Sequence, residues 1–436
     1  MISRGAEAES TGIPRVLQMC ANDRFAFYDI CRSHAEVLTQ LGFDVTTVFF
    51  APPTQLSRNR ISNAFPGKVE HLGLVPLKGQ TRRIATQIRN GFQAGLPDLI
   101  VAHRYRAFRV AMEMCQRAEP GMSGGVLGLA HEYGFLRGWR RRRRVKRFGL
   151  LPSKFGPRNV PIWLAGVSKP VADELTDITG RPSLTIPNVI DVDAADRVRL
   201  SKTDARRMLG LNPHAPLIGF VGRLEVIKNP MNVLLGFNAA RTRLPQDTQL
   251  VYLGDGTLRD ALQQKARTLG VANQVQFPGF VADARRYLAG IDALVVPASP
   301  EEAFGMVLLE AMLARVPVIC ADSPGPNTVL QNLGVGFELD RLETCVRALE
   351  STLASWSECE THQTGASAEP DSKNSLMSGR LERARQRVLQ HYSLGALAAC
   401  YRSFLPQLPP PPQPISPSPA ASPSRPPSGR FPHRAS

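Results

Sequence analysis

The stretch that decides the fold is Leu294–Cys320, LVVPASPEEAFGMVLLEAMLARVPVIC. Its first apolar run, 293–297, predicts a buried strand that ends in a short polar loop. A helix should begin near Phe304 or Gly305, and because it is apolar nearly all round we expect it to be buried. A second apolar run, Val316–Cys320, predicts the next strand. Strand, loop, helix and strand in this order are typical of an α/β sheet.

The same alternation extends along most of the chain. Helix-length amphipathic segments such as Leu258–Leu269, which Gly270 should end, separate short apolar runs. The runs are nearly continuous in apolar character, which indicates strands covered on both faces, as in a parallel sheet. We therefore predict an α/β protein with two doubly wound halves that join near Pro187–Asp193. The expected strands are 15–20, 45–50, 98–102, 126–130 and 162–167, then 217–221, 249–253, 275–277, 293–297 and 316–320.

The predicted organisation has four parts. Residues 1–12 should form a leader without fixed structure. Residues 13–188 should form a first domain, joined by a C-terminal helix at about 386–404. Residues 194–385 should form a second domain with a polar, exposed insertion at 357–378. Residues 405–436 should form a disordered tail, because 12 of the 36 prolines lie in the last 31 residues.

Composition limits the classes of function. The chain has 53 Lys and Arg against 37 Asp and Glu, a net charge of +16, which favours polyanionic partners such as nucleic acid, anionic lipid or phosphorylated substrates. No stretch approaches the roughly 20 apolar residues of a membrane span. The first twelve residues lack the apolar region of a secretory signal. Seven scattered cysteines without a C-x-x-C pair fit a reducing cytoplasm.

Two carboxylates flank the start of the apolar helix. Glu310 lies inside the helix, where a buried carboxylate is costly unless it is paired or hydrogen-bonded. Glu302 precedes it by eight residues. The free N–H groups of the helix start lie between them and attract an anion. A nucleotide sugar has this layout, with ribose, pyrophosphate and sugar in sequence. Alternatively, Glu302 is a solvated loop residue and Glu310 pairs with a core arginine.

Two more loops carry candidate phosphate-binding groups. In FVGRLEVIKN, residues 220–229, Arg223 and Lys228 follow a predicted strand and could converge on one pyrophosphate, or be two surface cations. In LGDGT, residues 253–257, Gly254 and Gly256 mark a loop where the backbone turns or approaches a ligand closely. Neither a P-loop nor a dinucleotide fingerprint is present.

Together these features resemble the retaining GT-B glycosyltransferases of the glycosyltransferase group 1 type, in particular those of lipopolysaccharide-core synthesis. The resemblance covers about 13–404 and is most specific over 217–330. It rests on a Gly-Arg turn, a downstream Lys, a G-x-G loop and two Glu residues eight apart. Here these are Gly222-Arg223, Lys228, Gly254-Asp255-Gly256 and Glu302 with Glu310; Ser168–Asp191 also resembles the family segment that leads into the hinge.

The resemblance implies a fold, a reaction and a set of roles. The fold is two Rossmann-like domains facing across a cleft, and the reaction moves a sugar from a nucleotide-sugar co-substrate with retention and without a metal or other cofactor. Arg223 and Lys228 would bind the diphosphate, Glu310 the ribose and Glu302 the sugar hydroxyls. The donor site would be completed by Gly222, Gly254, Gly256, Phe304 and Gly305.

Two histidines end predicted strands of the first domain. By the same resemblance, His131 in GLAHEY would face the donor sugar as a catalytic residue. His103 in VAHRYR is a weaker candidate on the acceptor side. For either residue, the alternative is a histidine that only packs in the core.

The sequence also departs from the family pattern. The first strand-to-helix loop, Ala21–Arg24, lacks the usual glycines, which affects how the first domain approaches the donor phosphates. Ala303 and Arg315 stand where the family usually has Gly. The loop at 323–327 lacks a Glu often found near it. A D-x-D triplet, Asp191–Asp193, lies in the expected hinge, so we interpret it as a turn or helix cap and expect no metal there.

A basic run, Arg137–Arg147, has eight cations in eleven residues, with Trp139 and Phe148 beside it. Such a run could hold the protein at an anionic membrane surface. We therefore expect a cytoplasmic enzyme on the inner face of the membrane, acting on a lipid-linked or polysaccharide acceptor. A solvated arginine loop is the alternative. No helix-turn-helix, RNP or KH pattern accompanies the run, so we expect no nucleic acid partner.

Three other functions stay open at this point. The protein could be a soluble family member that glycosylates a small metabolite. It could be a non-catalytic binding module, because of its unusual first loop. It could also bind nucleic acid through the basic run.

Overall fold

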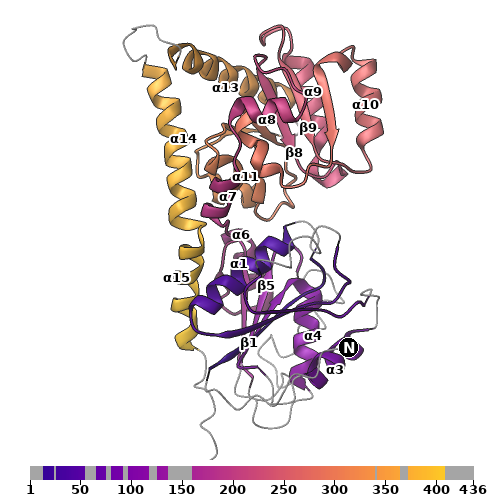
Figure 1. Cartoon of the computed structure of the whole chain (residues 1–436), viewed down its shortest axis with the longest axis vertical. Coiled ribbons are helices and arrows are strands. Elements are labelled where there is room, and N and C mark those ends of the chain that lie inside the picture. The colour runs from indigo at the N-terminus through magenta and orange to yellow at the C-terminus, as the bar shows by residue number, and fades with distance from the viewer. Residues whose placement is uncertain are drawn as a thin grey trace, which may run out of the picture.

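The computed structural model describes residues 13–23, 26–54, 65–74, 80–91, 97–116, 125–135, 160–338, 341–363 and 372–407. These residues form two α/β domains, one above the other in Figure 1, and the helices α14 (Ser372–His391) and α15 (Leu394–Phe404) run along one side of both. Two domains with parallel sheets were expected from the alternation of apolar runs and amphipathic helices, and this fold class is confirmed.

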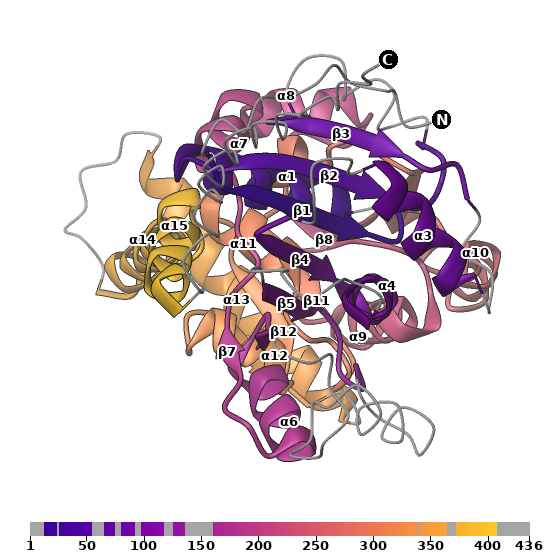
Figure 2. The same ribbon diagram turned by 90° about the horizontal axis from the view of Figure 1, so that it is seen from below.

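The first domain is built on a seven-stranded sheet in the order β3-β2-β1-β4-β5-β6-β7. All neighbouring strands pair in parallel, and Figure 2 shows the sheet from below. The strands are β1 (Arg15–Cys20), β2 (Asp44–Phe49), β3 (Lys68–His71), β4 (Leu99–His103), β5 (Gly125–Ala130), β6 (Ile162–Gly166) and β7 (Leu184–Thr185).

Alternation along the strands explains the layers of this domain. In β4, Leu99 and Val101 belong to the cluster that packs against α1 (Phe27–Gln40) and α15. Ile100 and Ala102 belong to the cluster formed with α3 (Thr81–Gly91), α4 (Arg104–Gln116) and α6 (Lys169–Thr179). Because successive side chains point to opposite faces, a central parallel strand must be apolar at every position.

The second domain has a six-stranded parallel sheet in the order β10-β9-β8-β11-β12-β13. Helices α9, α10 and α13 contribute apolar residues to the cluster on one face, while α11 and α12 contribute to the other. The strands are β8 (Leu217–Val221), β9 (Gln249–Leu253), β10 (Val275–Gly279), β11 (Ala293–Val296), β12 (Val318–Ala321) and β13 (Val335–Phe337). The helices and short turns are α7 (Val192–Val198), α8 (Lys202–Met208), η1 (Val226–Lys228), α9 (Pro230–Ala240), α10 (Arg259–Thr268), η2 (Ala272–Gln274), η3 (Ala284–Gly290), α11 (Met306–Leu313), α12 (Pro324–Leu330) and α13 (Leu342–Gln363). The short turn η4 (Leu405–Gln407) follows α15 and packs against the first domain.

Each sheet has a point where the strand order reverses. In the first sheet, β1 lies between β2 and β4, and in the second, β8 lies between β9 and β11. The loops that leave the carboxyl ends of such a strand pair run to opposite faces, which opens a crevice where ligands of α/β proteins bind. The topology therefore places candidate sites after β1 and β4 in one domain and after β8 and β11 in the other.

The chain crosses between the domains twice, and the crossings are bonded to each other. The backbone N–H of Ile190 donates to the carbonyl of Tyr392, with 2.9 Å between N and O. The carboxyl edges of the two sheets also meet directly, because the Ser168 hydroxyl, after β6, donates to the carbonyl of Ala303, after β11, at 2.7 Å. Arg385 of α14 adds a brace to the second domain by donating to Asp196 and to the carbonyl of Leu313.

The expected strands are all present, with ends shifted by up to two residues. The sequence reading missed β3, β7 and β13, which are two to four residues long and lie at sheet edges, where burial imposes less apolar pattern. The single helix expected at 386–404 was wrong. The chain forms α14 and α15 with a break at Tyr392, and the Ser393 side chain caps α15 by accepting from the Ala396 N–H.

The segment expected to be an exposed insertion, residues 357–378, is helical at both ends. The helix α13 runs to Gln363, and α14 begins at Ser372. Within the described residues, no helix combines the length and the apolar character that are needed to span a membrane.

Candidate active site

Two side chains of opposite charge meet where the strand order of the second sheet reverses. Lys228 lies in the loop after β8, and Glu302 lies in the loop after β11. The Lys228 ammonium donates to Glu302 Oε2 in a salt bridge. The two side chains are 32% and 18% exposed, so both are partly accessible from the crevice. The structure thus brings together one of the predicted cations and one of the predicted acids.

The glycines of the neighbouring loops let the backbones after β8 and β9 interlock. The Gly222 N–H donates to the Leu253 carbonyl, and the Leu224 N–H donates to the Asp255 carbonyl. A Cβ on Gly254 would lie 1.9 Å from the Gly222 carbonyl oxygen, and one on Gly256 would lie 2.5 Å from that of Leu224. Close contact with protein backbone therefore accounts for both glycines, and contact with donor phosphates stays a prediction.

The exposed Arg223 lies between these glycine loops and Lys228. Hydrogen bonds donated by the hydroxyl and the backbone N–H of Thr257 lower the pKa of the Glu225 carboxyl, and the charge of Arg223 lowers it further. Arg223 is absent from the residues that line the two cavities described below. Lys228 and Glu302 are absent from these linings as well.

The loop that carries Glu302 is fixed by tight backbone packing. Gly305 caps α11 in the left-handed region at φ 88°, which favours glycine. A Cβ on Gly325 of α12 would lie 2.3 Å from the Glu302 carbonyl oxygen. Phe304 is buried and packs edge-on against Tyr392, with 5.6 Å between ring centroids. Phe304 therefore holds the loop to the domain crossing.

Glu310 lines a cavity of about 510 Å³ between the domains, a size suited to a small organic ligand. The cavity takes residues from α1, from the crossing, from the loop after β10 and from α11. Its lining includes Tyr28, Asp29 and Arg32; Val189, Ile190, Asp191 and Arg197; Phe280, Val281, Asp283 and Arg285; and Met306 and Glu310. A ligand held there would touch both domains.

Burial dominates the electrostatics of Glu310. It raises the pKa of this carboxyl to about 7, against the attraction of the Arg285 guanidinium, while the charges of Asp29 and Asp283 raise it further. The neighbouring Arg285 pairs with Asp283, with 2.5 Å between Nε and Oδ1. Glu310 therefore changes charge near neutral pH, and a ligand that donates hydrogen bonds to it would favour the ionised form.

The loop after β10 holds site residues that the sequence reading missed. Phe280 is 64% exposed although it is a large apolar side chain beside the cavity. Asp283 has a left-handed backbone, at φ 56°, which is uncommon outside glycine. The signal that could have found them is position, because this loop follows the carboxyl end of a predicted strand, as the loops of Lys228 and Glu302 do.

In the first domain, the two predicted histidines lie side by side. His103 ends β4 and His131 follows β5, and their rings stack with centroids 5.3 Å apart. His103 Nδ1 and His131 Nε2 are 3.1 Å apart, within hydrogen-bond distance. Arg104, at φ 68°, donates to Glu132 and covers the ring of Phe27, which packs edge-on against His131.

The structure shows the local surroundings of three departures from the family pattern. In the first loop, Asp23 is buried, accepts from the Thr54 N–H and lies 3.3 Å from His71 Nε2, so a side chain ties this loop down. Arg315 has φ 56°, the left-handed conformation in which glycine is the usual residue. The carbonyl of Ala303 accepts the interdomain bond from Ser168.

The D-x-D triplet acts as a helix cap, as the sequence indicated. The Asp191 carboxylate accepts from the Ala194 N–H at the start of α7, and also pairs with Arg32 of α1 at 3.0 Å.

The basic run Arg137–Arg147 lies outside the described residues, so its role stays a prediction.

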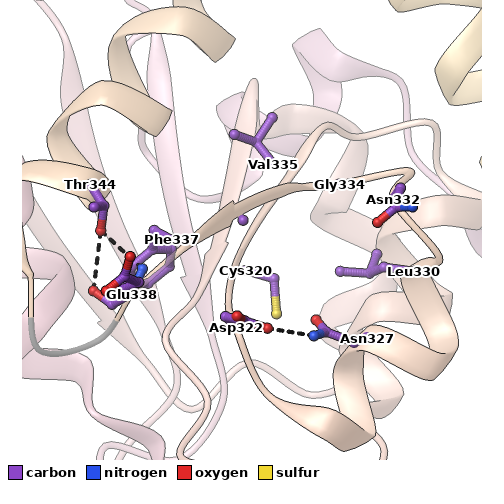
Figure 3. A pocket seen from close by; sticks show the side chains of 11 residues that line it. Cys320, Asp322, Asn327, Leu330, Asn332, Gly334, Val335, Phe337, Glu338 and Thr344 are labelled. Carbon is purple, nitrogen blue, oxygen red and sulfur yellow. Dashed lines mark hydrogen bonds between the residues drawn. The ribbon is translucent and has the colours of Figure 1, made fainter.

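A second cavity, of about 360 Å³, opens beside β12 and β13 (Figure 3). Asp322 and Glu338 line it, Asn327 donates to Asp322 at 2.5 Å, and the Cys320 thiol borders it. The residues that line this cavity include two carboxylates and no lysine or arginine, so it is unsuited to a diphosphate.

Part of the chain, mostly in its second half, matches the sequence model of a known family. Residues 201–367 match the sequence model of the family described as Glycosyl transferases group 1. This segment contains Lys228, Glu302 and Glu310 and extends past Gln363, the last residue of α13.

Two curated relatives cover similar parts of the chain. The D-inositol 3-phosphate glycosyltransferase of Rhodococcus jostii is 35% identical over 186 residues, which are 38% of this chain and 40% of the relative. The lipopolysaccharide core biosynthesis glycosyltransferase LpsE of Rhizobium meliloti is 29% identical over 202 residues, 46% of this chain and 52% of the relative. The chain thus aligns with about half or less of the length of each.

The likeness to solved structures extends over nearly the whole chain. The structure of Anabaena Alr3699/HepE, in complex with UDP and glucose, has a TM-score of 0.69 and covers 91% of this chain and 100% of that one at 16% identity. At this identity the likeness defines the fold, which is the GT-B arrangement of two Rossmann-like domains. Fold and family match together support the resemblance to the glycosyltransferase group 1 family.

We predict that Gly254→Ala lowers the free energy of unfolding by about 1–3 kcal/mol, because its methyl group would overlap the Gly222 backbone. Gly336→Ala is the control, since nothing lies within 4 Å of a Cβ there. Urea unfolding of both variants measures the effect. Equal stability of the two variants would contradict the interlocked loops.

Proposed function

We propose that this protein is a glycosyltransferase that moves a sugar, with retention, from a nucleotide-sugar donor onto a glycan or glycolipid of the cell envelope. The observation that carries the proposal is the meeting of Lys228 and Glu302 at the reversal of strand order in the second sheet. The group 1 match over the same residues and the UDP complex of a protein with the same fold support a nucleotide-sugar donor.

In this proposal the donor lies along the crevice of the second domain. The base would stack on the exposed Phe280, and the ribose hydroxyls would donate to Glu310 in the interdomain cavity. The diphosphate would take Lys228 as its counterion, with Arg223 as a second cation. Glu302, at the other end, would then accept from the sugar hydroxyls.

The Lys228–Glu302 salt bridge gives this binding a defined order of events. In the structure, each side chain is the partner of the other. A diphosphate that approaches Lys228 competes for its ammonium, and the released carboxylate becomes available to the sugar. As the bond to the sugar breaks, negative charge grows on the leaving diphosphate, and a fixed cation stabilises that state more than the ground state.

The acceptor class rests on charge and on a relative. The chain carries a net charge of +16, with a block of eight cations at 137–147 beside Trp139. The relative LpsE is named for lipopolysaccharide core biosynthesis. An enzyme that meets a lipid-linked acceptor at an anionic cytoplasmic membrane surface gains about 1 kcal/mol per cation near that surface. We propose no metal cofactor.

We predict that Lys228→Ala and Glu310→Ala each lower sugar transfer by about 100-fold or more while the fold survives. Transfer assays with UDP- and GDP-sugars, together with circular dichroism, measure this. Lys265→Ala on α10 serves as the control and should keep full activity. Near-normal turnover of either site variant would contradict the donor site.

We predict that nucleotide affinity rises with pH across neutrality, because the pKa of Glu310 is about 7 and only its ionised form accepts two hydroxyl hydrogen bonds. The affinity for UDP or GDP should increase up to about tenfold from about pH 6 to about pH 8. Glu310→Gln should remove this part of the dependence, and comparing the two proteins cancels the nucleotide's own titration. Parallel profiles would argue against a role for this carboxyl.

We predict that the chain sediments with phosphatidylserine vesicles and not with phosphatidylcholine vesicles at physiological salt. Replacing Arg140–Arg144 by serine should weaken binding by about fivefold for each cation that lies near the surface. Absence of binding by the unaltered chain would favour a soluble enzyme that glycosylates a small metabolite.

A further inference from the structure

We propose that His103 is a positioning residue that donates its Nδ1–H to His131 Nε2, and so keeps the ring proton of His131 on Nδ1. His131 then acts as a hydrogen-bond donor and not as a base. The assignment of the protons rests on the geometry of the first domain alone. Its consequence for catalysis rests on the proposed function.

The two imidazoles share one hydrogen bond, and burial keeps both of them neutral. Their facing nitrogens are 3.1 Å apart. Burial lowers the pKa of His131 to about 3 and that of His103 well below its ordinary value. With both rings neutral, one of the two facing nitrogens carries the hydrogen and the other accepts it.

The outward nitrogens of the pair, His103 Nε2 and His131 Nδ1, are both buried without a hydrogen-bond partner among the described residues, so the ring that donates is decided by where an acceptor is available. If His103 accepted through Nδ1, its own proton would be on Nε2, and a buried N–H without an acceptor costs about 1–3 kcal/mol. With Nδ1 donating, Nε2 is a bare lone pair, and no buried donor is left unpaired on that ring.

The other side of His131 fits the same arrangement. With Nε2 accepting, His131 carries its proton on Nδ1, which is buried. The side chain of Asn188, at the domain crossing, raises the pKa of His131, and its buried Oδ1 has no hydrogen-bond partner within the described residues, so it is the acceptor available to a proton on this ring.

A third histidine holds the pair in place. The His34 ring of α1 packs edge-on against His103, at 4.8 Å between centroids. His34 Nδ1 lies 2.7 Å from the Tyr401 hydroxyl of α15. His103 is thus fixed by stacking on one side and by an edge contact on the other, which is what a residue that sets the orientation of its neighbour requires.

The test is the protonation pattern of the histidine side chains, seen by NMR of the 15N-histidine-labelled chain near pH 7. In the unaltered protein, both His103 and His131 should carry their proton on Nδ1, with spectra of His103→Asn and His131→Asn assigning the signals. A proton on His131 Nε2, or a charged ring, would overturn the proposal whether or not the chain transfers sugar.

Two substitutions separate positioning from packing. Asn at position 103 places an amide N–H where Nδ1 lies, so His103→Asn should keep His131 protonated on Nδ1 and lower kcat little. His103→Leu removes the donor; it should shift the proton of His131 and lower kcat by about 10- to 100-fold, with KM for the donor nearly unchanged. Gln18→Leu, which removes a buried amide in β1, is the control for general destabilisation.

If His103→Leu and His103→Asn lose activity equally, or if Gln18→Leu loses as much, His103 acts only in packing and the proposal is wrong. Sugar transfer that is absent from the unaltered chain would refute the proposed function alone, because the NMR result stands independently of it.

Discussion

The structure depends on one constraint, which is that the carboxyl edges of two parallel sheets face each other across a double crossing of the chain. The Ser168–Ala303 bond joins loops from the two edges, and the Ile190–Tyr392 bond joins the crossings. Loops that follow strands of both sheets therefore bring polar groups to the interdomain space. A parallel sheet buries both faces, so its edge is where such groups can remain accessible. The candidate site follows from this arrangement more than from any single residue.

Charge in that space is nearly balanced between paired groups. Lys228 pairs with Glu302, and Arg32 with Asp191, so cations are held beside carboxylates in a partly buried crevice. Glu310 is the exception, because burial outweighs the attraction of Arg285 and leaves its carboxyl poised near neutrality. Perturbed acids of this kind concentrate at functional sites, since the free energy of burying them is recovered when a ligand supplies the missing partners.

The sequence motifs and their structural roles do not coincide one to one. Gly254 and Gly256 read as a ligand loop, yet their first contacts are with the backbone after β8, because strands that are neighbours in the sheet send their loops into one another. Arg315 reads as a departure from a family glycine, and it nevertheless keeps the left-handed backbone that such a glycine would adopt. At these positions the motif residues serve the backbone conformation of their loops, and contact with a ligand would be an additional role of the same loops.

The sequence by itself determined the two α/β halves, the strands at the centre of each sheet, a cap or turn at Asp191 and the acids and cations that are candidates for a donor site. Apolar runs and charged exceptions are local patterns, so one chain suffices to read them. Only the tertiary structure decided that Phe280 and Arg285 join Glu310 in one cavity, that α14 and α15 are separate helices, and that His103, His131 and His34 touch. These residues are far apart along the chain or lie on different strands. Their proximity comes from strand order, which no local pattern records.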